Sequence, residues 1–294
     1  MLAAEYERHG HEVLIYDYNF WGKQFAEFRR MAGRVHAVHF IGAVGLRKIW
    51  HAWILRYKMK TTVLVHIVGS EVFRYRKIGV LDKWMWISAL KQAHRVFAVA
   101  PWLTREWKNK VPVETFPVFF KNYRKTRTQT PEKFTVLVYL PQSRPEFYGA
   151  DIVRKLIKAQ PQMHFLILGK NPCSRPRSNL TVRAIDFERD MDAVYNESSV
   201  LLRLTEHDGL SNMVLEALAN DLPVIWTHRL PHVITVERRY DAVETALMKI
   251  QNQPQPVNSS EWTQKQFNLN RLAEQLFAFY EQPDKTLPAD IDYV

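Results

Sequence analysis

Two acidic residues bracket a segment that the sequence marks as the start of a helix. Asp208 and Glu216 lie eight positions apart, directly after an apolar run typical of a buried strand. Between them, Ser211 and Asn212 are residue types that favour a helix N-cap. The free N–H groups and positive dipole of a helix N-terminus attract phosphate, and Gly209 lets the backbone approach a ligand closely. The segment is therefore a candidate site for a phosphate-bearing ligand.

The spacing of Asp208 and Glu216 suits an extended ligand. Eight helical steps span about 12 Å at roughly 1.5 Å per residue. One carboxylate could accept hydrogen bonds from sugar hydroxyls and the other from ribose hydroxyls, with a diphosphate between them at the helix terminus. The simpler alternative is that the two acids only complement the helix dipole and solvate its surface.

A second candidate lies in the first half of the chain, where His66 ends an apolar run and precedes Gly69, Ser70 and Glu71. A histidine in this position can hydrogen-bond a sugar or polarise a hydroxyl, and Glu71 can orient it. A satisfied structural histidine is the alternative. The pairs His9/His11 and His36/His39 have no carboxylate or thiol company, and we interpret them as structural.

The elements that must position these residues follow an alternating pattern. Short apolar runs separated by helical patterns indicate βαβ units, and hence an α/β protein with parallel sheets. The expected strands are 12–18, 35–41, 62–68, 95–100, 134–140, 164–168, 180–184, 199–204 and 223–226. The expected helices are 23–32, 46–59, 81–93, 150–159, 190–196, 212–219 and 270–281.

A polar, proline-containing run at 121–132 interrupts this alternation and is interpreted as an interdomain linker. It predicts an N-terminal Rossmann-like domain over 1–128, a C-terminal one over 129–269, and a tail over 283–294. Ligands of open parallel sheets bind beyond the carboxyl ends of the strands. A cleft between the two domains is the expected place for such a ligand, and both candidate clusters fall in loops that follow strands.

Charge is unevenly distributed along the chain. The formal net charge is +11, with +14 over residues 1–130 and −3 over the remainder, and seven of nine tryptophans lie in the basic part. Such a surface suits an anionic membrane or a polyanion, and the stretch 46–60 places apolar and basic residues at helical spacing. Core packing of that stretch and solubilising surface charge are the alternative.

Other features narrow the class of protein. No apolar window is long enough to span a membrane. The single cysteine, Cys173, cannot form an internal disulfide, which favours a reducing, cytoplasmic location, with attachment at the side of a membrane. The run Asp190-Met191-Asp192 is interpreted as a helix start rather than a metal site. The chain carries no recognisable RNA- or DNA-binding motif, so no specific nucleic-acid partner is expected.

The string 208–219, DGLSNMVLEALA, followed by Leu222–Ile225, resembles the acidic-x7-Glu signature of retaining GT-B glycosyltransferases. It is most similar to glycosyltransferase family four, the group 1 glycosyl transferases. Segment 8–13 resembles that family's first helix-to-strand turn, and segment 66–72 its His-x-x-Gly-Ser-acid loop. The helix 270–282 resembles one that packs back on the first domain.

The resemblance implies a GT-B fold, with two Rossmann-like domains facing a central cleft. It implies metal-independent, retaining transfer from a nucleotide sugar, expected to be a UDP- or GDP-sugar, to a glycan, lipid-linked or other hydroxyl acceptor, without a further cofactor. Glu216 would bind the donor ribose and Asp208 the transferred sugar, with Glu206 as the alternative to Asp208. Amides near sugar and phosphate would come from Gly209, Leu210, Ser211 and Asn212. His66 would be catalytic, with Gly69, Ser70 and Glu71 on the acceptor side.

The chain departs from the family pattern in two places. Members usually supply an arginine and a lysine after the second domain's first strand, whereas here Tyr148 stands at the lysine position and Arg144 lies within one residue of the arginine. Arg144 with Lys170 or Arg203 would then neutralise the diphosphate, unless these bases have ordinary surface roles. By the same resemblance, Met1 is expected to correspond to a position inside the family's first helix, without the usual first strand and Gly-rich loop, which predicts a more open cleft.

Two rival functions remain at this stage. One is a GT-B-fold epimerase or hydrolase of sugar nucleotides, which would act without an acceptor. The other is a decayed, non-catalytic transferase whose basic half binds a polyanion or a membrane surface.

Overall fold

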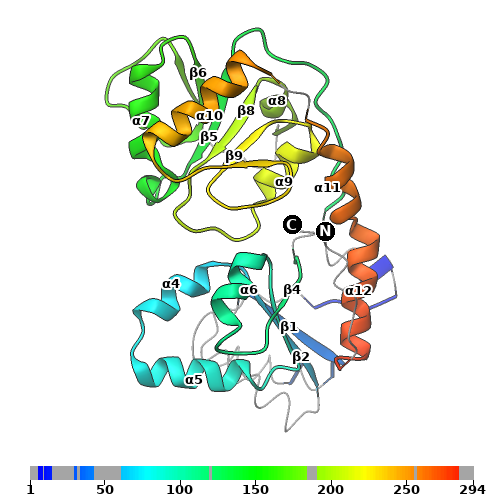
Figure 1. The fold of residues 1–294 in the computed structure, drawn as a ribbon. Helices are drawn as coiled ribbons and strands as arrows, with labels where there is room; N and C mark the ends of the chain where they lie inside the picture. The colour runs from blue at the N-terminus through cyan, green and yellow to red at the C-terminus, as the bar shows by residue number, and fades with distance from the viewer. Residues whose placement is uncertain are drawn as a thin grey trace. The chain divides into compact units, whose positions relative to one another are not determined.

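A computed structural model of the chain describes residues 6–8, 10–14, 30–31, 34–42, 61–118, 121–183, 191–254 and 257–284. These residues form two compact units (Figure 1). Unit 1 holds the described residues up to Lys121 and those from Asn268 onward, and unit 2 holds Asn122–Phe267. Each unit is described by itself.

Among the described residues of unit 1, parallel strands form one sheet in the order β1-β2-β3-β4. The strands are β1 Ala37–Ile41, β2 Thr62–Ile67, β3 Arg95–Ala98 and β4 Glu114–Thr115. The helices are α4 Ser70–Lys77, α5 Val80–Leu90, α6 Pro101–Trp107 and α12 Leu269–Glu281. Apolar runs such as Val63–Val65 are fully buried, as expected of a parallel strand covered on both faces.

Aromatic side chains from several elements meet in the core of unit 1. Trp86 of α5 and Trp107 of α6 are each about 1% exposed, and their ring centroids lie 6.3 Å apart. Phe279 of α12 packs against Phe97 of β3, with centroids 4.9 Å apart. The C-terminal helix α12 therefore completes the core of the unit formed by the N-terminal half of the chain, and Asn268 caps it by accepting a hydrogen bond from the Arg271 amide.

Among the described residues of unit 2, parallel strands form a sheet in the order β10-β9-β8-β5-β6-β7. The strands are β5 Thr135–Leu140, β6 His164–Gly169, β7 Leu180–Arg183, β8 Val200–Arg203, β9 Val224–Trp226 and β10 Val233–Thr235. The helices are η1 Pro145–Tyr148 (a 3-10 helix), α7 Ala150–Ala159, α8 Met191–Asn196, α9 Asn212–Ala219, α10 Tyr240–Asn252 and α11 Ser260–Gln266.

Helices cover both faces of this sheet (Figure 1). On one face, α7 and α10 pack together over alternate strand residues such as Val136, Val138 and Leu202. On the other face, α9 packs against β8 and β9, with α11 beside it. The inner strands β5, β6, β8 and β9 are largely buried, so their sequences are apolar throughout rather than alternating, whereas the edge strands β7 and β10 are partly exposed.

The sequence-based elements agree with the structure for the expected strands from 35–41 onward and for helices such as 150–159 and 212–219, which have the predicted bounds. The short strands β4 and β10 and the helices α4, α6, α10 and α11 were not predicted. The expected strand 12–18 and the helices 23–32 and 46–59 lie largely or wholly outside the described residues.

The expected linker 121–132 has no helix or strand, but much of it is held on unit 2. Tyr123 is buried, and the backbone amides of Thr126 and Arg127 donate to Asn220 Oδ1 at 2.8 and 2.7 Å. The contact-based boundary accordingly falls between Lys121 and Asn122.

No helix of the described residues is long and apolar enough to cross a membrane.

Candidate functional site

The loop between β8 and α9, together with the strand end and helix start that flank it, carries most of the predicted donor-site residues. Strand β8 ends at Arg203, and α9 begins at Asn212 after Ser211, whose extended backbone (φ −73°, ψ 120°) marks the N-cap. Gly209 and Leu210 are half-buried in this loop, and Asn212 is exposed. The sequence predicted a helix that starts between Asp208 and Glu216, and the start of α9 at Asn212 confirms it.

Asp208 is fixed by an ion pair at the end of β8. Its Oδ2 accepts from Arg203 Nε at 2.5 Å and from Thr205 Oγ1 at 3.1 Å. The side chains of Arg203 and Asp208 are only 11% and 15% exposed, so the pair is shielded from screening by solvent. Arg203, one of three bases considered for the diphosphate, thus neutralises Asp208 in this arrangement.

Glu216 lies within α9, one turn after Asn212. Its Oε2 accepts a hydrogen bond from the Tyr195 hydroxyl of α8 at 2.6 Å. Burial and the nearby Glu216 raise the pKa of the Tyr195 hydroxyl well above its usual value, so Tyr195 stays a donor. A second buried tyrosine, Tyr123, donates to Asn212 Oδ1 at 3.3 Å. Its pKa is also raised by burial, with a contribution from the charge of Glu216.

Gly149 allows the β8 loop to approach the start of α7. Its φ of +91° is a left-handed conformation, and a Cβ at this position would lie 2.6 Å from Leu204 Cβ. Both backbone strain and contact therefore require glycine here. The Glu206 amide donates to the Phe147 carbonyl at 3.0 Å, which ties the loop to η1.

Arg238 is a site residue that the sequence analysis missed. Its Nε donates to the Leu204 carbonyl at 3.1 Å, and one terminal nitrogen contacts Asp151 Oδ1 at 2.9 Å and the Glu146 carbonyl. One guanidinium thus joins the β8 loop, η1 and α7. It follows β10, a strand too short for the periodicity to reveal, so the sequence carried no signal for it.

The predicted diphosphate-binding bases lie at the end of β8 (Arg203) and directly or shortly after the neighbouring strands β6 (Lys170) and β5 (Arg144). Lys170 comes directly after β6, is exposed, and its amide donates to the Leu140 carbonyl at the end of β5 at 2.7 Å. Arg144, exposed and left-handed (φ 57°), lies with its guanidinium 5.5 Å from the Phe147 ring centroid. Tyr148 stands at the position of the family's lysine. The guanidinium carbon of Arg203 lies over its ring, 5.7 Å from the ring centroid.

A pocket of about 570 Å³ opens beside this loop at the carboxyl ends of β8, β9 and β10. It includes Glu206, the predicted alternative to Asp208. The other lining residues, missed by sequence, are Thr205, Thr227, Thr235, Val236, Glu237 and Arg238.

In unit 1, His66 belongs to a buried chain of hydrogen bonds. Its Nε2 contacts the Phe116 carbonyl at 3.0 Å, and its Nδ1 contacts His39 Nε2 at 2.5 Å. His39 Nδ1 contacts the Tyr280 hydroxyl at 2.7 Å, which in turn contacts the Tyr6 hydroxyl at 2.5 Å. Five segments distant in sequence, including α12, are joined by this chain.

The tautomers of the two histidines follow from the Phe116 carbonyl at one end of this chain. A carbonyl only accepts, so the Nε2 of His66 carries the proton and its Nδ1 accepts from His39 Nε2–H. The remaining nitrogen of His39 then accepts from Tyr280, and Tyr280 accepts from Tyr6. Burial lowers the pKa of His39 to about 3, and burial with the neighbouring His39 holds the pKa of His66 well below its ordinary value. Both imidazoles are neutral, and both nitrogens of the fully buried His66 are used within unit 1.

Glu71 is turned toward the backbone rather than toward His66. Its Oε2 accepts from the amides of Val68 and Gly69 at 3.2 and 2.8 Å, and the side chain is about 1% exposed. Burial raises the pKa of this carboxyl above its usual value. Its Oε1 is buried without a hydrogen-bond partner among the described residues and lies 3.8 Å from the place of a Cβ on Gly42. Ser70, the first residue of α4, is exposed.

The structure therefore brings the predicted residues together in two groups. One comprises the donor-side residues of unit 2 and the other comprises His66, Gly69, Ser70 and Glu71 of unit 1. The described residues contain no group of three or more His, Cys, Asp or Glu side chains placed to hold a metal ion. Tyr195, Arg238, His39 and Tyr280 were missed as partners because the spacing of residues in sequence does not show contacts between distant segments.

Comparisons with known proteins show what the sequence and the fold are similar to. Residues 145–252 match the family model described as "Glycosyl transferases group 1". No curated protein sequence gives a significant match.

Solved structures resemble the chain in fold. A sucrose-phosphate synthase from Thermosynechococcus elongatus aligns with TM-score 0.71 and 16% identity, over 88% of this chain and 77% of that one. A UDP-forming α,α-trehalose-phosphate synthase from Burkholderia xenovorans aligns with TM-score 0.61 and 10% identity, over 97% and 86%.

The pneumococcal O-GlcNAc transferase GtfA, solved with UDP and GlcNAc, aligns with TM-score 0.61 and 13% identity, over 90% of this chain and 60% of that one. The chain therefore spans less than two thirds of that transferase. From these comparisons, the chain has the GT-B fold, and its segment 145–252 is similar to the group 1 glycosyl transferases.

Proposed function

We propose that this protein is a glycosyltransferase that moves a sugar from a nucleotide-sugar donor to an acceptor hydroxyl, with retention of configuration and without a metal. The observation that carries the proposal is the pair of acids around the start of α9, each held by a partner from another element. Asp208 is held by Arg203, and Glu216 is held by Tyr195. The match of the surrounding segment to the group 1 glycosyl transferases supports it.

The proposed roles follow from chemistry at this edge of the sheet. Glu216 accepts hydrogen bonds from the ribose hydroxyls of a UDP- or GDP-sugar, and Tyr195 keeps its carboxylate in one orientation. Asp208 accepts hydrogen bonds from the transferred sugar, with Glu206 facing the neighbouring pocket. The amides of Gly209, Leu210, Ser211 and Asn212 lie at the helix terminus, where the donor's diphosphate is stabilised.

Positive charge must also compensate the leaving diphosphate. Arg203 is engaged with Asp208, so we assign this role to Lys170 and Arg144, which are exposed after β6 and β5. The leaving phosphate oxygen takes the proton of the attacking acceptor hydroxyl, so no protein general base is required at that step. We propose no protein nucleophile. On the acceptor side, Gly69, Ser70 and Glu71 shape the start of α4, and the buried His66 holds the end of β2 in place.

The binding test measures thermal stabilisation and calorimetric affinity with UDP, GDP, ADP and CMP and their sugar conjugates. A ligand at about 100 times its Kd adds roughly 2.7 kcal/mol to the stability of the folded state. We expect one nucleotide to bind, and Glu216→Gln to weaken it at least tenfold. Glu244→Gln is the matched control, because Glu244 also accepts from a tyrosine, Tyr240, on the surface of α10. Absence of binding by every nucleotide would overturn the donor site.

The activity test separates transfer from the rival functions. With the nucleotide sugar identified by binding, the products are resolved with and without a panel of glycan, lipid-linked and simple hydroxyl acceptors. Transfer requires an acceptor-dependent glycoside in the anomeric configuration of the donor. Release of free sugar or an epimer without acceptor would favour a hydrolase or an epimerase. Salt-dependent binding of a polyanion without nucleotide binding would favour a non-catalytic module.

A further inference from the structure

Helix α5 presents large apolar side chains to solvent. Val80, Leu81 and Trp84 are 84%, 69% and 66% exposed, while Trp86 and Leu90 on its inner side are buried. The outer face of a surface helix ordinarily carries polar residues. An apolar inner face satisfies the core of unit 1, so the apolar outer face has no role in holding that core together.

The exposed residues form a stripe that leads toward positive charge. At about 100° per helical residue, Val80, Trp84 and Lys91 project within roughly 40° of one another. Lys91 is the C-cap of α5 and keeps helical backbone angles (φ −64°, ψ −16°), so this count extends to it. The outer face of α5 thus runs from an apolar first turn to a lysine at its last.

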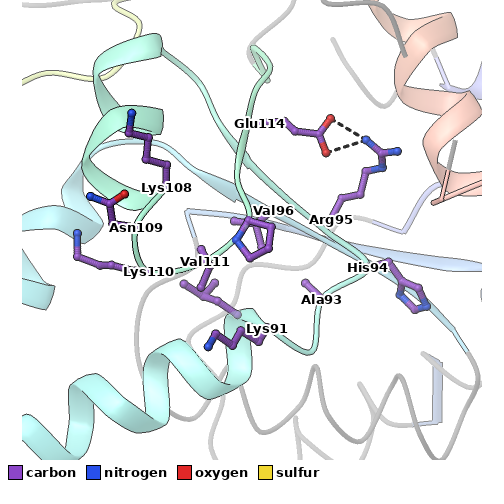
Figure 2. A pocket seen from close by; sticks show the side chains of 12 residues that line it. Lys91, Ala93, His94, Arg95, Val96, Lys108, Asn109, Lys110, Val111 and Glu114 are labelled. Carbon is purple, nitrogen blue, oxygen red and sulfur yellow. Dashed lines mark hydrogen bonds and ion pairs between the residues drawn. The ribbon is translucent and has the colours of Figure 1, made fainter. Parts of the chain in front are cut away.

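Lys91 borders a pocket of about 540 Å³ between the end of α5 and the end of α6. Figure 2 shows Lys91, Lys108 and Lys110 on one side of it. The acid at the pocket, Glu114, is paired on the other side with Arg95, whose Nη1 donates to both carboxylate oxygens at 2.7 Å. The lysine side therefore keeps its net positive charge.

More positive charge lies at the other end of the stripe. Arg74, Arg76 and Lys77 in the last turn of α4 are exposed and precede the apolar first turn of α5. Over Ser70–Lys91 there are five Lys or Arg and two acids, and one of those acids, Glu71, is buried. Cationic residues thus flank the apolar turn on both sides.

This combination identifies the partner by its chemistry. An apolar strip with a tryptophan, bordered by lysine and arginine, matches the boundary between acyl chains and anionic headgroups. A second copy of this face would bring like charges together in a two-fold interface, which is unfavourable. The pocket lies where β3 and β4 begin, at the sheet edge opposite the carboxyl ends that carry the α4 loop.

We propose that α5 lies in the surface of an anionic membrane, with Val80, Leu81 and Trp84 inserted at the acyl boundary and Lys91 and Lys108 contacting lipid phosphates at the mouth of the pocket. This docking surface is separate from the donor site and does not rest on the proposed transferase activity. It also differs from the stretch 46–60 considered from sequence, which lies outside the described residues.

The test is co-sedimentation of the full chain with phosphatidylcholine vesicles, with and without phosphatidylglycerol. We expect binding to the anionic vesicles at low salt that weakens as salt rises. Leu81→Ser/Trp84→Ser and, separately, Lys91→Glu/Lys108→Glu should each weaken binding at least tenfold. The controls are Ile234→Ser and Lys158→Glu, which alter exposed residues of the same types in unit 2. Unchanged thermal midpoints will show that the variants fold.

A site-specific label tests the insertion itself. In a Cys173→Ser background, an environment-sensitive dye on Trp84→Cys should shift to shorter emission wavelength with anionic vesicles, whereas the dye on Ile234→Cys should not. Lack of binding to anionic vesicles at low salt, or equal binding by the variants and wild type, would overturn the proposal. So would a concentration-dependent dimer that both double variants abolish. Glu216→Gln should bind vesicles normally, which separates failure of docking from failure of the donor site.

Discussion

The hydroxyl of Tyr195 donates a 2.6 Å hydrogen bond to Oε2 of Glu216, joining α8 to α9 across 21 residues of sequence. Tyr195 is about 1% exposed, and its raised pKa keeps it protonated at any physiological pH. The carboxylate proposed to bind ribose is therefore oriented by a rigid partner rather than by solvent. Preorganisation of this kind lowers the entropic cost of ordering the side chain when the ligand binds.

Tyr195→Phe should weaken nucleotide binding while leaving the fold intact, because it removes the hydroxyl and keeps the ring. The loss of a hydrogen bond worth about 1 kcal/mol corresponds to roughly a fivefold rise in Kd. Isothermal titration calorimetry with the nucleotide selected by the binding panel measures it. Tyr240→Phe, which breaks the corresponding Tyr–Glu contact on α10, should leave Kd unchanged. Equal effects of the two variants would contradict an orienting role.

Breaking the Arg203–Asp208 pair should destabilise unit 2. Each partner is shielded, so Asp208→Asn and Arg203→Gln should each lower the free energy of unfolding by about 1–3 kcal/mol, since a buried charge loses its partner. The double variant should cost less than the sum, because the two groups interact directly. Urea unfolding of all three variants gives the coupling. The exposed pair Arg239–Asp241 is the control, and its removal should leave the free energy of unfolding unchanged, because solvent screens its charges.

Much of the architecture could be predicted from the sequence, because a strand buried on both faces reads as a continuous apolar run. The helix over 212–219 was predicted with its bounds because the N-cap residues and the apolar period coincide there. The strands β4 and β10 are two and three residues long, too short for any period, and were missed.

The candidate site was predicted less completely than the fold. The positions of Asp208 and Glu216 follow from a local motif, but their partners do not. Thr205 lies within the same loop as Asp208, whereas Tyr195 reaches Glu216 only because two helices meet. His39 was interpreted as structural and does contact His66, a pairing set by the register of β1 against β2. Such contacts depend on tertiary packing, which one sequence does not encode in spacing.

Gly149→Ala should destabilise the protein by more than about 2 kcal/mol, since it combines left-handed backbone strain with a Cβ clash against Leu204. Gly10→Ala provides the strain alone, because its φ is +81° and nothing lies within 4 Å of the added Cβ. Gly79→Ala has neither problem, as its φ is −67° and the added Cβ would make only an ordinary contact, with Asp82 Oδ2 at 4.0 Å. Thermal unfolding should rank the three losses in this order. A Gly149→Ala loss no larger than that of Gly10→Ala would contradict the close contact.

Glu71→Gln should stabilise unit 1 increasingly as pH rises. The folded-state pKa of Glu71 is raised above the ordinary 4.5, so the wild type has its full contribution below pH 4.5 and loses it as pH rises through the folded value. Glutamine keeps an oxygen to accept from the Val68 and Gly69 amides but does not ionise. Unfolding measured across pH should show that the free energies of unfolding of wild type and Glu71→Gln differ least at acid pH. The difference between them should grow as pH rises above 4.5. Glu71→Ala, which leaves both amides without that acceptor, should lose stability at every pH.

The buried histidine chain predicts the opposite dependence at acid pH. The folded-state pKa of His39 is about 3 against an ordinary 6.5, and that of His66 is also lowered, so both are neutral in the folded protein and protonated in the unfolded chain below pH 6.5. The unfolded state then binds more protons, and stability is present above pH 6.5 and lost as pH falls toward 3, by up to about 1.4 kcal/mol per pH unit for each histidine.

Tyr280→Phe removes the donor to His39 and the acceptor of Tyr6 and should cost about 1–3 kcal/mol at neutral pH. Because the chain joins α12 to β1 and β2, hydrogen exchange should show these three elements opening together as the pH is lowered. Loss of protection in α12 alone, with β1 and β2 still protected, would show that the chain does not couple them.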